Sequence, residues 1–177
     1  KVPYHFVDVF FRFGVDGWTD KMLRLQRKGY NMNLVFENLR NCREVDIFAA
    51  VNIVVGIPGE TEEDVDEMIR NLLHCSKSFN ILSQVNTLIL AGGSHYYMHP
   101  EQHGIRFRDD KKAVYEQHPY FVPTDLWYSE NPYIDQEIRT RRMVRILHEL
   151  DRHHVSIGES ALDVLNNLKR KDSVQMG

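Results

Sequence analysis

The residues best placed to bind a ligand lie around a Gly-Pro-Gly turn. The stretch AVNIVVGIPGETEED, residues 50–64, begins with an apolar run typical of a strand covered on both faces and continues through Gly56 and Pro58-Gly59. Glycine at such a turn lets the backbone approach a ligand closely. The lysine of a Walker loop and the glycine spacing of a dinucleotide fingerprint are missing. The residues alone predict a ligand-facing loop, and a plain structural turn is an equally good interpretation.

Three histidines have a spacing that suggests a metal site. His95, His99 and His103 are four residues apart and would line one face of a helix. Pro100 argues against that helix, and Gly104 closes the segment. We interpret them as histidines of a surface loop, with a metal site as the alternative, and predict no metal ligands in this chain.

Four arginines gather on a helix predicted over residues 135–152: Arg139, Arg141, Arg142 and Arg145. They are expected to lie opposite its apolar stripe, interleaved with acidic residues. A solvent-exposed helix face is the default interpretation, and a phosphate or nucleic-acid patch is the alternative.

Three strand-like runs would position these residues. They cover residues 5–13, 50–55 and 84–90, and each ends in a glycine-containing loop. The first two are followed by clear helices, and Thr61 with Asp64 predicts a capping box at the start of the second. Strands that alternate with helices pair in parallel. We therefore expect an α/β fold: a partial (β/α) barrel of about three βα units, plus C-terminal helices.

The chain changes character after residue 95. Residues 1–95 hold the three βα units and are expected to form the partial barrel. Residues 96–177 are expected to form an irregular, aromatic-rich segment and C-terminal helices that pack on the barrel, the last helix starting at Ser160. The aromatic stretch between Tyr115 and Tyr133 is too long for a plain connection, so it predicts a functional loop or a wrapping segment.

Composition narrows the class of protein. A net charge of −3 over 177 residues gives no global reason to expect nucleic acid as a partner. No signal peptide is recognisable, and no apolar run approaches the roughly 20 residues of a membrane span. The two cysteines, Cys42 and Cys75, predict buried thiols in a cytoplasmic protein. Because a strand-like run begins almost at Lys1, we interpret the chain as a piece of a longer protein.

Residues 9–94 resemble the second half of a radical S-adenosylmethionine enzyme barrel. FGVDG at 13–17, with the helix that ends in KGY at 28–30, is similar to the fourth strand of that family and its loop. Residues 52–64 resemble the fifth-strand phrase, which often reads Gly-Leu-Pro-Gly-Glu-Thr. Residues 88–94, followed by Pro100-Glu101 and Gly104-Ile105, resemble the sixth strand. The resemblance is closest to cobalamin-associated members, such as the anaerobic magnesium-protoporphyrin monomethyl ester oxidative cyclase group.

The resemblance implies a barrel that holds a four-iron cluster and S-adenosylmethionine at the carboxyl ends of its strands, with cobalamin as a further cofactor of some members. In such enzymes an electron from the cluster cleaves the sulfonium, and the deoxyadenosyl radical takes a hydrogen from the substrate. No catalytic residue is implied in this chain. Six residues are implied to bind the cofactor, with Asp16 near its ribose or amino group, the backbone of Asn52, Val54 and Gly56 on the adenine side, and Gly59 and Glu60 in the following loop.

The chain also departs from the family pattern. The three-cysteine cluster loop that follows strand one has no counterpart, Asp16-Gly17-Trp18 replaces the usual Glu-Ser-Gly, and Asn52 stands where glycine is frequent. We expect the cluster loop and any cobalamin domain in an N-terminal part of the same protein, and no independent activity for this piece. The alternative is a non-catalytic, barrel-like binding or assembly module. Exposed barrel edges predict self-association.

Overall fold

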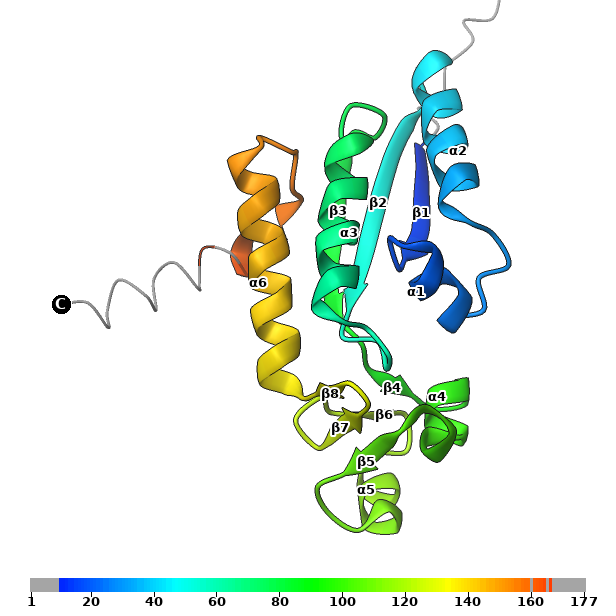
Figure 1. Ribbon diagram of the computed structural model, residues 1–177, viewed down its shortest axis with the longest axis vertical. Helices are drawn as coiled ribbons and strands as arrows, with labels where there is room; N and C mark the ends of the chain where they lie inside the picture. Colours follow the sequence, from blue (N-terminus) through cyan, green and yellow to red (C-terminus); the bar gives the residue numbers. More distant parts are fainter. Residues whose placement is uncertain (1–9, 160, 165, 167–177) are drawn as a thin grey trace, which may run out of the picture.

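A three-stranded parallel sheet forms the centre of the computed structural model, which describes residues 10–159, 161–164 and 166 (Figure 1). Its strands, in the spatial order β1-β2-β3, are β1 (Phe10–Asp16), β2 (Phe48–Val55) and β3 (Ile81–Thr87). The connections contain α1 (Asp20–Leu25) and α2 (Met32–Glu44), and then α3 (Glu62–His74). Both strand pairs are parallel, which confirms the predicted α/β fold.

Two strand boundaries differ from the prediction. The first strand continues past Phe13 to Asp16, and the predicted residues 5–9 lie outside the described part. The third strand ends at Thr87, three residues earlier than the predicted end at residue 90, and Leu90–Ala91 form a separate short strand, β4. The apolar run near residue 90 therefore belongs to two elements.

Side-chain caps set the starts of the helices. Thr19 Oγ1 accepts a hydrogen bond from Met22 N at 3.1 Å, and Asn31 Oδ1 accepts one from Leu34 N at 3.1 Å. Thr61 and Asp64 form the predicted capping box, with Thr61 N donating to Asp64 Oδ2 at 2.7 Å. Each cap satisfies an otherwise unpaired N–H and typically stabilises the helix by about 1 kcal/mol.

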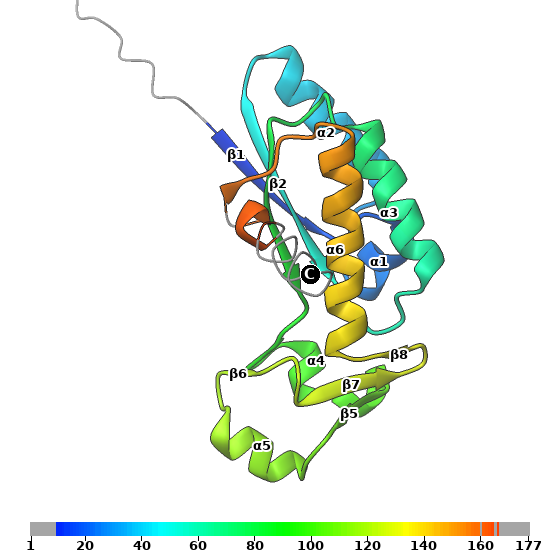
Figure 2. The ribbon, with the colours of Figure 1, turned by 90° about the vertical axis from the view of Figure 1, so that its left-hand side faces the viewer.

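The helices α1, α2, α3 and α6 (Gln136–Arg152) cover one face of the sheet (Figure 2). Alternate residues of β2 (Ala49, Val51, Ile53 and Val55) are fully buried in the core that these helices share with the sheet. Asn52 and Val54, on the other face, are only half-buried, because none of these helices crosses that side. The prediction that β2 is covered on both faces is therefore wrong for these two residues.

The helix α6 completes a third crossover. It packs beside α3, and the chain after it returns to β3, where Leu82 N donates to Ser156 O at 2.9 Å and Gly158 N donates to Leu82 O at 2.8 Å. Ile157 thereby forms a parallel bridge with Leu82. The predicted last helix begins at Ser160, which lies outside the described residues, and residues 161–164 are helical. In the described part of the chain, the outer edge of β3 is thus paired with the backbone at Ile157, whereas the outer edge of β1 has no paired strand.

Residues 88–134 form a small lobe below the sheet in Figure 1. The lobe contains β4, α4 (His95–Met98), the 3-10 helix η1 (Pro100–His103), β5 (Ile105–Phe107), α5 (Lys111–Gln117), β6 (Phe121–Val122), β7 (Trp127–Glu130) and β8 (Tyr133–Ile134). Antiparallel pairs join β4 to β6 and β5 to β7 to β8 around a second apolar cluster that includes Trp127. The aromatic stretch is therefore not irregular throughout, but its strands have only two to four residues, too few for an alternating pattern to show. Among the described helices, none has the length and apolar character needed to cross a membrane.

Candidate functional site

The candidate site lies on the sheet face that α1–α3 and α6 leave open. Asn52 and Val54 of β2 pair in register with Gln84 and Asn86 of β3, and both β3 side chains are exposed. Arg12 is exposed on β1. A parallel sheet normally buries apolar side chains on both faces. An open, polar face at the centre of such a sheet is therefore available to a ligand or to another part of the protein.

Gln84 and Asn86 are not among the site residues predicted from the sequence. The signal that could have found them is the alternation of polar and apolar residues from Gln84 to Thr87. The predicted strand, residues 84–90, begins three residues after the start of β3, and this shift hides the pairing of these residues with β2.

Asp16 and Asn52 lie together at this face. Asn52 Nδ2 donates to Asp16 Oδ1 at 2.7 Å, and Lys28 Nζ forms an ion pair with the other carboxylate oxygen. Asp16 has a φ of 60°, in the left-handed region, which turns the chain at the end of β1. Non-glycine residues in this region often cluster at binding sites, where the surrounding structure holds the strain.

Trp18 holds the main chain of Asn52 in place. It is fully buried, and its indole Nε1 donates to the main-chain oxygen of Asn52 at 2.8 Å. The Asn52 side-chain oxygen is buried and has no hydrogen-bond partner among the described residues. An unpaired acceptor beside a carboxylate suits a ligand that brings hydroxyl or ammonium donors. The predicted contact of this pair with the ribose or amino group of S-adenosylmethionine stays a prediction.

The loop after β2 closes on itself through Glu60. Gly56 N donates to both carboxylate oxygens, at 3.0 and 3.1 Å, and Glu60 N donates to Ile57 O at 2.9 Å. The Glu60 side chain is fully buried and also accepts a hydrogen bond from Arg142 Nη1 at 3.1 Å. Gly59, with a φ of +93°, is half-buried at the tip of the loop. Glu60 thus directs its carboxylate into the protein, and the backbone of the loop is the part that can face a ligand.

The arginines of α6 do not form a solvent-exposed cluster. Arg139 is fully buried and Arg142 is 4% exposed, so the predicted exposed face is wrong for both. The reason is helical spacing, because residues 139, 142, 146 and 150 share the buried side of α6. In the first half of α6, which lies near the loop, the residues on this buried side contact carboxylate and main-chain carbonyl groups instead of apolar side chains.

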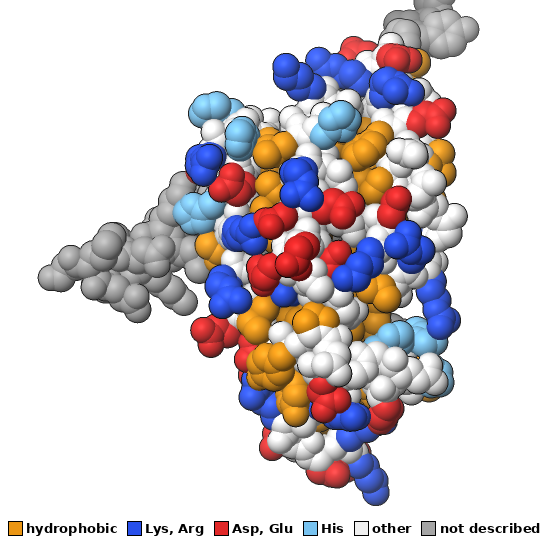
Figure 3. All heavy atoms as spheres, viewed as in Figure 1, with side chains coloured by type: hydrophobic (Ala, Val, Ile, Leu, Met, Phe, Trp, Pro, Cys, Tyr) orange, Lys and Arg blue, Asp and Glu red, His pale blue; other side chains and the backbone are white. Residues whose placement is uncertain are grey.

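The other two arginines of this group lie at the surface. Arg145 pairs with Glu62 and Asp66 of α3, and Arg141 lies 3.9 Å from Glu62. Acidic and basic side chains accordingly stand side by side over α3 and α6 in the space-filling view (Figure 3). This surface is an ion-pair network and not a basic patch.

Burial raises the pKa of Glu60 to about 7, although Arg142 and the Gly56 amide lower it. The folded protein thus holds a proton at pH values where the unfolded chain has released it, so this group's contribution to stability falls as pH rises from about 4.5 to about 7. The charged groups near it are Arg139, Arg142 and Glu62.

We expect Glu60→Gln to remove this pH dependence. The free energy of unfolding of the unmodified protein minus that of the variant should decrease between pH 5 and pH 8, by on the order of 2 kcal/mol. Urea denaturation at each pH measures both values. A difference that stays constant over this range would show that Glu60 keeps an ordinary pKa.

The three spaced histidines come together at the start of the lobe. His95 Nδ1 and His103 Nε2 are 2.7 Å apart and share a hydrogen bond, and the His95 and His99 rings lie 4.9 Å apart. His95 lies in the short helix α4 and His103 in the 3-10 helix η1, and His99 stands between the two helices. The segment is therefore not a plain loop. Within the part of the chain that the structure describes, no group of three His, Cys, Asp or Glu side chains is arranged to hold a metal ion.

Both cysteines are buried in the main core. Cys42 is 7% exposed and Cys75 is 4% exposed, and burial raises the pKa of Cys75 to about 12. Cluster ligation needs thiolates that can reach the iron. The residues present therefore do not fit an iron–sulfur cluster.

The elements that carry the Asp16–Asn52 pair and the Gly56–Glu60 loop fall within one match to known proteins. Residues 5–72 match the Radical SAM superfamily. This range contains β1, its loop, β2, and most of α3. It supports a radical S-adenosylmethionine segment, as the resemblance implied, while the sixth-strand resemblance near residues 88–105 lies outside it.

A curated protein is similar to part of this chain. The chain is 38% identical over 60 residues to a tRNA-2-methylthio-N(6)-dimethylallyladenosine synthase from Bifidobacterium adolescentis. The aligned part is 33% of this chain and 12% of the relative, so the chain matches only about an eighth of that protein. The cobalamin-associated cyclase group stays a prediction.

Proposed function

We propose that this chain is part of a radical S-adenosylmethionine enzyme and contributes one wall of its cofactor site. The observation that carries the proposal is the Asp16–Asn52 pair, which lies inside the matched range. Asp16 is the last residue of β1, and Asn52 lies on the neighbouring parallel strand β2, three residues before its end. Ligands of α/β proteins bind at the carboxyl ends of such strands. In this proposal Asp16 and Asn52 accept hydrogen bonds from the ribose or ammonium group, and the backbone of Val54, Gly56 and Gly59 lines the rest of the cofactor.

The iron–sulfur cluster of such an enzyme supplies the electron that cleaves S-adenosylmethionine. Neither Cys42 nor Cys75 can hold it, because both thiols point into the apolar core. We therefore propose that the cluster cysteines belong to another part of the same protein. This chain would bind and orient the cofactor. A cyclase or methyltransferase reaction with cobalamin as a further cofactor stays a prediction.

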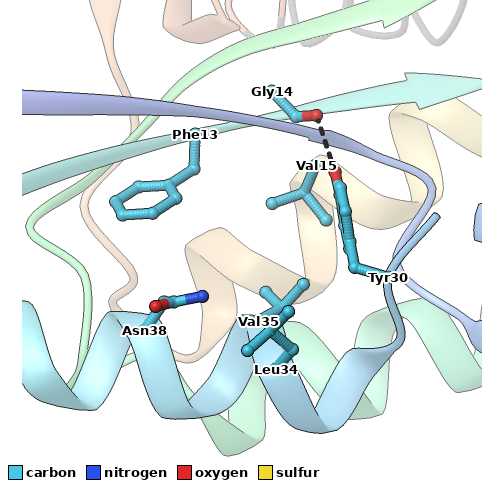
Figure 4. A pocket seen from close by; sticks show the side chains of 7 residues that line it. All are labelled: Phe13, Gly14, Val15, Tyr30, Leu34, Val35 and Asn38. Atoms are coloured by element: carbon cyan, nitrogen blue, oxygen red, sulfur yellow. Dashed lines mark hydrogen bonds between the residues drawn. The ribbon is translucent and has the colours of Figure 1, made fainter. Parts of the chain in front are cut away.

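The outer edge of β1 is where we propose that this other part attaches. Phe10 and Phe11 are 63% and 46% exposed there. Close by, an apolar cavity of about 150 Å³ opens between β1 and α2, and the Tyr30 hydroxyl donates to the Gly14 oxygen at 3.2 Å (Figure 4). The cavity is lined by Phe13, Gly14, Val15, Tyr30, Leu34, Val35 and Asn38. Open strand edges recruit further strands, so the isolated chain would pair with a second copy, which sedimentation velocity would detect.

Binding of S-adenosylmethionine to variants of the longer protein tests the proposed role of Asp16. Asp16→Asn keeps the size of the side chain but removes the charge, so it should raise the dissociation constant by about tenfold. Asp46→Asn is the control, because Asp46 also has a left-handed backbone, with a φ of 57°, but lies exposed before β2. Isothermal titration calorimetry measures both. Equal affinities of the two variants would contradict the assignment of Asp16.

The alternative is a non-catalytic, barrel-like binding or assembly module. The burial of both cysteines favours this alternative, because a non-catalytic module does not require cysteines that bind an iron–sulfur cluster. The two proposals differ in whether the protein that contains this chain binds iron.

A further inference from the structure

The loop after β2 is held by a residue of α6, Arg142, which lies 82 residues after Glu60 in the chain. Arg142 of α6 donates through Nη1 to the carboxylate of Glu60 at 3.1 Å and to its main-chain oxygen at 3.2 Å. Its Nε donates at 2.8 Å to Oε1 of Glu62, which is the first residue of α3. One guanidinium group thus joins the end of the loop to the start of the next helix.

Glu60 relays this contact to the beginning of the loop. Its two carboxylate oxygens accept the buried Gly56 N–H, so the hydrogen bonds run from the end of β2 through Glu60 to α6. If Glu60 turned away, the Gly56 amide would lose its partner in a buried place, which is unfavourable. The position of Glu60 therefore decides the conformation of residues 56–60.

Arginine is suited to this place because its planar fork donates to two acceptors at once. The Arg142 side chain is 4% exposed and the Glu60 side chain is fully buried, so water screens their contact little. A lysine at residue 142 would offer a single charged group and would not span Glu60 and Glu62 in the same way.

We propose that Arg142 is a positioning residue of the cofactor loop. From α6 it holds Glu60 in the orientation that binds the Gly56 amide, and it thereby sets the backbone that would face S-adenosylmethionine. The part that concerns the cofactor rests on the proposed function, whereas the part that concerns the loop does not. The helix α6 is then a component of the cofactor site and not merely a cover of the sheet.

Arg145 provides a matched control on the same helix. It pairs with Glu62 and Asp66 and so also joins α6 to α3, but it makes no contact with Glu60. Arg145→Met removes a bridging arginine and leaves the hydrogen bonds to the loop in place. A difference between the variants at residues 142 and 145 therefore reports on the loop and not on the packing of the helix.

Amide hydrogen exchange at Gly56 tests the positioning role directly. In Arg142→Met, exchange at Gly56 should accelerate by about tenfold relative to exchange at Val51 in the middle of β2. The ratio of the two amides corrects for any loss of global stability. Arg145→Met should leave the ratio unchanged. If Arg142→Met does not fold, Arg142→Lys is measured in its place and should show the same direction of change.

The affinity for S-adenosylmethionine tests the link to the cofactor. In the protein that includes the preceding sequence, Arg142→Met should raise the dissociation constant by about tenfold, and Arg145→Met should not change it. An unchanged ratio of Gly56 to Val51 exchange in the folded variant would overturn the inference. A wild-type protein that does not bind S-adenosylmethionine would overturn the proposed function instead, and the exchange ratio would still decide the role of Arg142 in the loop.

Discussion

Replacing Arg139 with methionine should lower the free energy of unfolding by about 3–5 kcal/mol. Arg139 donates to the main-chain oxygens of Thr124, Trp127 and Ile134 at 3.2–3.3 Å, and its guanidinium carbon lies 3.6 Å from the centre of the Trp127 ring. Methionine keeps much of the apolar stem but donates no hydrogen bond. The main-chain carbonyl groups that now accept hydrogen bonds from Arg139 would lose this donor beside the buried Trp127 ring.

The control for this prediction is Arg141→Met. The Arg141 side chain is 66% exposed, and its ion pair with Glu62 is long at 3.9 Å, so its loss should change the stability by less than about 0.5 kcal/mol. Urea denaturation followed by circular dichroism measures both variants. If the two replacements had similar effects, Arg139 would not join α6 to the lobe in the way described above.

Replacing Gly56 with alanine should also be severe, at about 2–5 kcal/mol. The φ of Gly56 is +80°, which an L side chain rarely adopts, and an added Cβ would lie 2.3 Å from Cγ of Arg139. The variant thus combines backbone strain with a clash against a side chain that is itself held by three hydrogen bonds. Thermal or urea unfolding measures the loss.

Gly93→Ala separates these two causes. Gly93 has almost the same backbone, with a φ of +79°, but no heavy atom lies within 4 Å of the Cβ it would gain. Its replacement should cost only the strain, about 1–2 kcal/mol. Equal losses at residues 56 and 93 would show that Arg139 can move away from the loop.

Local patterns were enough to predict the elements of the barrel segment. The alternation of strands and helices and the capping box of Thr61 and Asp64 depend on residues within a few positions of each other. These predictions are confirmed because tertiary contacts do not override such short-range signals here.

The burial of Arg139 and Arg142 could not be predicted in the same way. An arginine on a helix is normally solvated, and only partners far away in the chain make its burial favourable. Glu60 is 82 residues from Arg142, and the carbonyl groups around Arg139 come from a lobe whose strands are too short to recognise. The roles that we propose for Asp16 and Asn52 are implied by the resemblance, and the structure adds that their side chains are in contact.

The most direct measurement of the central claim is iron content together with deoxyadenosine formation. The longer protein that we propose, with this chain and the cluster cysteines, would be reconstituted anaerobically with iron and sulfide, then reduced in the presence of S-adenosylmethionine. We predict a bound four-iron cluster and the release of deoxyadenosine, with less product from Asp16→Asn. A protein that binds no iron and forms no deoxyadenosine would contradict it and leave the non-catalytic module as the explanation of this fold.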